Sequence, residues 1–252
     1  MESTQKFNGL ADVYTIGRPG YASGLIDYLY LKHGFSDQSV IADIGSGTGK
    51  FSKLLLDKES AVYCVEPNND MRNKAIKELF KYKKFHSING TATETTLDES
   101  SVDFITVAQA FHWFNVPLFK EECKRILKED GRVFLIWNLR DTCSEINLHS
   151  FEIFSKYCPN FKGFSGGIEK DDVRIKEFFN DKYNYVEFDN PILYTTKDIF
   201  INRCLSSSYS LKEGDKNYQK YLEELSKLYD KHVDNNILTM PNKTVAYFGM
   251  LK

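Results

Sequence analysis

The stretch Asp43-Ile44-Gly45-Ser46-Gly47-Thr48-Gly49 begins in the last two residues of a short apolar run at residues 40–44. Its glycines allow positive φ angles and let a ligand approach the backbone closely. Apolar residues at helical spacing come next, and the helix starting near Gly49 has free N–H groups that attract an anionic group. This stretch therefore predicts a strand, a ligand-binding loop and a helix in succession.

The same alternation continues outward along the first half of the chain. Helical patterns at 71–80 and 117–127 separate further short apolar runs, and Glu129-Asp130-Gly131 indicates a turn. The predicted strands after the first are residues 61–65, 85–88, 102–107 and 132–137. Short apolar strands alternating with helices are typical of an α/β protein with a parallel, doubly wound sheet.

The second half is less regular. Strands are predicted at 183–188 and 245–248, as the last two strands of one seven-stranded, mostly parallel sheet. The predicted helices are residues 146–157, 173–179, 198–205 and 218–233. Since no linker rich in Pro, Gly or Ser separates these elements, we expect a single domain with helical additions.

Composition excludes several classes of protein. The 252 residues carry 33 Lys and Arg against 35 Asp and Glu, so nucleic acid and anionic lipid are not expected partners. Apolar runs are too short to cross a membrane, and the polar N-terminus shows no signal peptide. Five cysteines without C-x-x-C spacing predict free thiols in the cytoplasm and no metal site. A small-molecule partner fits this balance best.

The glycine-rich loop fails two nucleotide-binding motifs. The third glycine of the dinucleotide fingerprint G-x-G-x-x-G would fall at Lys50, and Gly49-Lys50 is followed by Phe51 and not by the Ser or Thr of a phosphate loop. Glu66 nevertheless follows the next strand, where an acid often binds a ribose diol. An NAD-dependent oxidoreductase therefore stays a less favoured alternative.

The loop does match the D-x-G-x-G-x-G motif, and the chain resembles the class I S-adenosylmethionine-dependent methyltransferases, which have a Rossmann-like fold. Gly90-Thr91-Ala92 is similar to their segment beside adenine. Phe111-His112-Trp113-Phe114 is similar to the A-x-H-W-F segment of a small-molecule subgroup that includes trans-aconitate methyltransferase. Tyr14 and residues 18–21 resemble the Y-x-x-x-R-P-x-Y segment of that subgroup.

This resemblance implies that S-adenosyl-L-methionine is the cofactor. The loop would admit its methionyl part, and Glu66 would accept hydrogen bonds from its ribose. Gln109 would either lie near its methyl group or tie down its own loop. Capping is the alternative for Asp43, core packing for Met71 and an ordinary solvated acid for Glu66. The implied cofactor-binding residues are Asp43, Gly45, Ser46, Gly47, Gly49, Glu66, Pro67, Asn68, Met71, Thr91, Ala92 and Gln109.

The resemblance also implies an acceptor site. His112 would be the catalytic residue, as a base or as an orienting donor, because its ordinary pKa is near neutral; bracing of its own loop is the alternative. Arg18 would bind an acceptor carboxylate or else form a structural ion pair. The implied acceptor-binding residues are Tyr14, Arg18, Trp113 and Trp137.

The predicted activity is transfer of a methyl group from S-adenosylmethionine to a small molecule, with a carboxylic acid as one candidate. A non-catalytic protein that binds the cofactor is an alternative. Within the single domain 1–252, the predicted parts are a lid at 1–34, a cofactor-binding core at 35–140, a helical cap at 141–180 and 196–234, and closing strands at 183–195 and 235–252.

Overall fold

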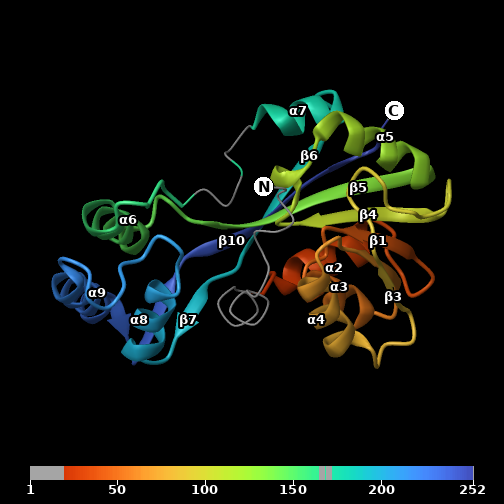
Figure 1. Cartoon of the computed structure of the whole chain (residues 1–252). Coiled ribbons are helices and arrows are strands. Elements are labelled where there is room, and N and C mark those ends of the chain that lie inside the picture. Colours follow the sequence, from red (N-terminus) through yellow and green to blue (C-terminus); the bar gives the residue numbers. More distant parts are fainter. Residues whose placement is uncertain (1–19, 165–167, 169–171, 252) are drawn as a thin grey trace. The chain divides into compact units, whose positions relative to one another are not determined.

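The computed structural model describes residues 20–164, 168 and 172–251 (Figure 1). Tyr14 and Arg18 lie outside these residues, as does most of the predicted lid. The described chain forms two compact units. The first comprises residues 20–137, 168, 172–188 and 244–251, and the second comprises residues 138–164 and 189–243.

A seven-stranded sheet organises the first unit, in the order β3-β2-β1-β4-β5-β10-β6. Strand β1 pairs in parallel with β2 and β4, β2 pairs in parallel with β3, and β4 with β5. This sheet confirms the predicted fold class. The strands are β1 (Val40–Ile44), β2 (Ala61–Val65), β3 (Phe85–Ile88), β4 (Val102–Ala108), β5 (Leu127–Arg140), β6 (Asn184–Asp189) and β10 (Asn242–Gly249).

Strand β10 runs opposite to β5. Asp141, just after β5, donates its N–H to the carbonyl of Pro241, just before β10, at 3.2 Å. At the other end, Met250 and Leu251 line a pocket together with Leu127, the first residue of β5. The sheet is thus parallel except at this strand.

The predicted turn at residues 129–131 is wrong, because β5 continues through it. Val102 of β4 is opposite Leu127, whereas Phe104 is opposite Arg132, so two steps along β4 match five along β5. A Cβ on Gly131 would come within 2.6 Å of the Leu127 side chain and 3.1 Å of the Asp103 carbonyl. Glycine here permits a bulge inside a strand and does not mark its start.

Helices cover both faces of the sheet, as Figure 1 shows for α5 and α7 on one side and α2, α3 and α4 on the other. Phe119 of α5 stacks on Phe178 of α7 with ring centroids 5.2 Å apart. On the other face, Leu25, Phe51 and Phe134 share one buried cluster. The helices of this unit are α2 (Ser23–Lys32), α3 (Lys50–Leu56), α4 (Asn69–Leu79), α5 (Val116–Ile126) and α7 (Val173–Phe179), with a 3-10 turn η2 (Phe111–Trp113).

The second unit has its own core. It contains helices α6 (Glu145–Tyr157), α8 (Lys197–Leu205) and α9 (Tyr218–His232). The ring of Phe154 lies 5.5 Å from that of Phe161 and 5.4 Å from that of Tyr209. Aromatic side chains from the second half of the sequence therefore pack on one another in a core separate from that of the sheet.

A three-stranded antiparallel sheet, β7-β9-β8, completes the second unit. Its strands are β7 (Ile192–Tyr194), β8 (Val233–Asp234) and β9 (Ile237–Met240). Strands this short show too little alternation to be predicted from sequence. Helix α7, which falls in the predicted cap, groups with the sheet in the first unit. Within the described ranges, no helix is both long and apolar enough to span a membrane.

One buried carboxylate links three elements of the first unit. Asp43 in β1 is fully buried. Its two oxygens accept hydrogen bonds from Ser52 Oγ of α3 at 2.5 Å and from Thr106 Oγ1 of β4 at 2.8 Å. Burial raises the pKa of Asp43 to about 6, although both hydroxyl bonds act to lower it. Asp43 thus fixes the chain just before the glycine-rich loop begins.

Asp43→Asn should remove a pH dependence of stability. The Asp43 carboxyl group releases its proton near pH 4 in the unfolded chain and near pH 6 in the folded chain. The free energy of unfolding of the wild-type protein therefore falls as pH rises through this range. This rise in the pKa of Asp43 corresponds to a loss of about 3 kcal/mol in the free energy of unfolding. Urea unfolding at pH 4 and pH 7 should therefore show wild type losing roughly this amount relative to Asp43→Asn.

The control is Asp37→Asn, at an exposed position in the turn before β1. It should follow wild type at both pH values. Equal pH dependence in wild type and Asp43→Asn would show that ionisation of Asp43 does not lower the free energy of unfolding.

Candidate functional site

The glycine-rich loop connects β1 to α3 and depends on close packing. Gly45, Gly47 and Gly49 have φ angles of +70°, +58° and +78°, in the left-handed region that favours glycine. A Cβ on Gly45 would lie 2.6 Å from that of Ala110, and one on Gly49 would lie 2.5 Å from Cδ1 of Leu79. The first of these glycines therefore lets the segment after β4 approach the loop, and the last lets α4 approach.

The loop is fixed to the end of β2 by its own N–H groups. Gly45 and Ser46 donate to the carbonyl of Val65 at 2.8 and 3.2 Å, and Gly47 donates to Oε2 of Glu66 at 3.0 Å. The predicted ribose-binding acid and the predicted methionine-binding loop are thus direct neighbours in the structure.

Glu66 is held in place from several sides. Its Oε1 accepts from the N–H of Asn68 at 2.8 Å, and its carbonyl accepts from Arg72 at 2.8 Å. Burial raises the pKa of Glu66, although its two backbone hydrogen bonds and Arg72 act to lower it. Each carboxylate oxygen can accept more than one hydrogen bond, so ribose hydroxyls can be added to these contacts.

Ser46 supplies a second indication of a polar ligand. Its Oγ is buried and makes no hydrogen bond to any residue in the described ranges. A buried polar group that stays unpaired costs roughly 1–3 kcal/mol. An orphaned hydroxyl in the middle of the glycine-rich loop fits a polar cofactor group bound there.

The residues after β2 serve both the loop and helix α4. The Asn68 side chain accepts from the N–H of Met71 at 3.0 Å and caps α4. Met71 is buried in the core, which agrees with its packing alternative. Pro67 lies between Glu66 and Asn68, and its carbonyl accepts from Arg72 at 3.2 Å.

The segment after β3 is anchored by a residue that sequence reasoning missed. The N–H and Oγ1 of Thr95 donate to Oε1 of Glu122 in α5 at 2.9 and 2.5 Å. Burial acts to raise the pKa of Glu122, but hydrogen bonds from Arg125 and Thr95 outweigh it and lower the pKa to about 2. The loop with exposed Thr91 and half-buried Ala92 is thereby held against α5.

The segment after β4, which contains His112, lies against the glycine-rich loop. Ala110 and Phe114, on either side of His112, are the two residues that a Cβ on Gly45 would meet. Gln109 has a φ of +60° and donates its N–H to the carbonyl of Ile136 at 2.8 Å, which redirects the chain as β4 ends. His112 is half-buried, with its ring 4.8 Å from that of the exposed Trp113.

Trp137 lies deeper than an acceptor-binding residue normally does. Its side chain is fully buried and packs edge-on against Phe111 and Tyr247, with ring centroids 6.1 Å away in both cases. The structure therefore brings together the loop, Glu66 and the His112 segment, while Trp137 is part of the core.

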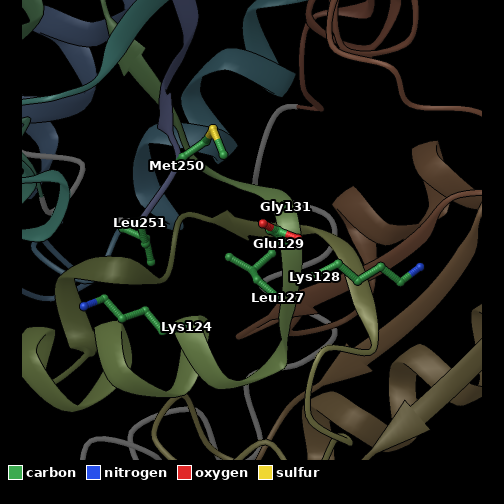
Figure 2. Close-up of a pocket in the computed structure, with 7 residues that line it drawn as sticks. All are labelled: Lys124, Leu127, Lys128, Glu129, Gly131, Met250 and Leu251. Atoms are coloured by element: carbon green, nitrogen blue, oxygen red, sulfur yellow. The ribbon is translucent and has the colours of Figure 1, made fainter.

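A pocket of about 180 Å³ lies elsewhere in the first unit (Figure 2). It is at the start of β5, and ligands of such sheets bind beyond the carboxyl ends of the strands, so it is not the cofactor site. Its lining residues are Lys124, Leu127, Lys128, Glu129, Gly131, Met250 and Leu251.

Comparison with known proteins agrees with this geometry. Residues 42–135 match the family model described as a methyltransferase domain. An uncharacterised methyltransferase of Mycobacterium tuberculosis is 30% identical over 244 residues, which cover 95% of this chain and 93% of that protein. A methyltransferase-like protein of Schizosaccharomyces pombe is 31% identical over 132 residues, covering 51% of this chain and 49% of its own.

Solved structures show the same fold at low sequence identity. A proposed type II methyltransferase of Anaeromyxobacter dehalogenans superposes with a TM-score of 0.63 at 16% identity, covering 93% of this chain and 98% of that one. The YcgJ protein of Bacillus subtilis gives 0.55 at 17% identity, covering 90% and 96%. The oxidoreductase alternative is therefore set aside, and the chain belongs to the class I S-adenosylmethionine-dependent methyltransferases.

Proposed function

We propose that this methyltransferase acts on a small molecule, with a carboxylic acid as the acceptor class, as in the subgroup that its H-W-F segment resembles. The observation that carries the proposal is the contact of the His112 segment with the glycine-rich loop through Gly45. The near balance of 33 basic and 35 acidic residues supports a small acceptor over a polyanion. Arg18, outside the described residues, remains the predicted partner of an acceptor carboxylate.

The described residues would hold the cofactor in two places. Ser46 Oγ and the loop backbone would bind its methionyl end, and Glu66 would accept hydrogen bonds from its ribose. Bound S-adenosylmethionine supplies a methyl group on a positively charged sulfur, which is a good leaving group. The protein is then left with the tasks of aligning the acceptor and excluding water.

The acceptor class decides what His112 does. A carboxylate is already ionised at neutral pH, so its oxygen attacks the methyl carbon without losing a proton. A base is needed only for an acceptor that carries a proton of high pKa. With a carboxylic acid, His112 would donate a hydrogen bond that orients the carboxylate, and Trp113 would line the acceptor site.

We further propose a cytoplasmic location. All five cysteines are free, and four of them are buried. Free thiols persist in reducing compartments. The division of the chain into a lid at 1–34, a core at 35–140 and a cap at 141–180 and 196–234 also remains a proposal.

Transfer of labelled methyl from S-adenosylmethionine to a panel of acceptors tests the substrate class. The panel contains carboxylic acids, the matching amides, amines, a protein mixture and RNA. Methyl esters of the acids should form, and the amides should stay unlabelled, because only an ionised carboxylate offers a nucleophilic oxygen. Labelling confined to protein or RNA would contradict a small acceptor, and labelling of amines would contradict the carboxylic acid.

Glu66→Gln should weaken cofactor binding. It keeps the size of the side chain but leaves one oxygen to accept from either the Gly47 or the Asn68 N–H, and it removes the charge that strengthens hydrogen bonds from ribose hydroxyls. Calorimetric titration should show affinity for S-adenosylmethionine lowered by about 10- to 100-fold. Glu152→Gln, at an exposed position on α6, is the control and should bind like wild type. Unchanged affinity in Glu66→Gln would remove Glu66 from the cofactor site.

His112→Ala should lower turnover far more than cofactor affinity. Loss of the orienting hydrogen bond misplaces the acceptor, so kcat with an accepted substrate should fall about 100-fold. The Kd for the cofactor should stay within about threefold, because Glu66 and the loop remain. His86→Ala, where the ring stacks on Tyr63 in a neighbouring strand, is the matched control. Equal losses of turnover and affinity would assign His112 to bracing the loop.

A further inference from the structure

A cluster of metal-ligating side chains lies in the second unit, between α6 and α9. Glu145 and His149 are four residues apart on α6, so they share one face of the helix. His232 is the last residue of α9. Nδ1 of His149 lies 3.1 Å from Nε2 of His232, and one ligand atom from each of the three residues falls within 4.8 Å of the others.

We propose that Glu145, His149 and His232 form a binding site for a divalent cation of the Zn²⁺ type. Imidazole nitrogens with one carboxylate are a common set of three protein ligands for Zn²⁺, and water takes the fourth position. Two imidazoles also favour Zn²⁺ and its transition-metal neighbours over Mg²⁺ and Ca²⁺, which prefer oxygen. No ligand of this set belongs to the methyl-transfer site.

The distances fit such an ion. Two nitrogen ligands about 2.05 Å from a tetrahedral Zn²⁺ are separated by about 3.3 Å. The two histidine nitrogens lie 3.1 Å apart, close to this separation, and both rings must turn out of their mutual hydrogen bond to face a shared ion. Glu145 is exposed, and its carboxylate can rotate toward the two rings from solvent.

One neighbouring charge opposes a cation at this position. Nζ of Lys231 lies 2.9 Å from Oε1 of Glu145, and both side chains are more than half exposed. Exposed ion pairs are worth roughly 0.2–1 kcal/mol, so a cation can displace Lys231 at small cost. Lys231 therefore lowers the affinity of the site without closing it, and its replacement should tighten binding.

Calorimetric titration of the full-length, chelator-treated protein with ZnCl₂ tests the site. One Zn²⁺ should bind per chain, Tm should rise with Zn²⁺ and fall back with EDTA, and MgCl₂ should leave Tm unchanged. His149→Ala and His232→Ala should each weaken Zn²⁺ binding at least about tenfold, since each removes one of three ligands.

Two further variants separate a metal site from a structural contact between the helices. His149→Gln can still hydrogen-bond to His232 but is a poor zinc ligand, so it should fold normally and lose Zn²⁺ binding. Lys231→Gln should bind Zn²⁺ more tightly than wild type, by about two- to fivefold at low ionic strength. Circular dichroism establishes that each variant is folded.

Cys143→Ser is the matched control, because Cys143 is an exposed thiol two residues before Glu145. It should bind Zn²⁺ like wild type. The proposal is overturned by no heat and no Tm change at 100 μM ZnCl₂, by binding that persists in both histidine variants, or by binding that is lost only in Cys143→Ser.

Discussion

The buried carboxylate of Asp43 is the constraint on which the methyltransferase core depends. Ser52 and Thr106 each donate to one of its oxygens, so β1, α3 and β4 are linked at one point. The glycine-rich loop starts two residues later, and its path is therefore set by a contact inside the core. Burying this group carries an electrostatic cost, which shows as its raised pKa. The core carries this electrostatic cost directly before the glycine-rich loop.

The candidate site depends on close contact between the glycine-rich loop and the neighbouring segments. Only glycine allows Ala110 to lie against the loop at position 45 and Leu79 at position 49. The loop N–H groups then reach the end of β2, and Gly47 meets Glu66 directly. The glycine-rich loop, Glu66 and the His112 segment follow three neighbouring strands, so their spacing follows from strand pairing and the 4.8 Å repeat of the sheet.

The second unit is stabilised in a different way. Its core consists largely of aromatic rings around Phe154, closed by a small antiparallel sheet. Helices α6 and α9 carry the proposed cation site, and a metal there would join the start of one helix to the end of the other. Such a link would stabilise this unit without any part in methyl transfer, because its ligands are separate from the loop, Glu66 and His112.

Local patterns in the sequence determined the first unit well. Short apolar strands, glycine spacing and helix signals are all contained in a few consecutive residues, so the predicted fold class is confirmed. The predicted site residues Gly45, Glu66 and His112 follow three neighbouring strands, and their roles stay predictions. Contacts between distant residues were beyond such patterns. Glu122 anchors Thr95 across 27 positions, His149 meets His232 across 83, and Trp137 is enclosed by rings from other elements. Tertiary structure alone decided these, because packing brings together side chains whose separation along the chain carries no periodic signal.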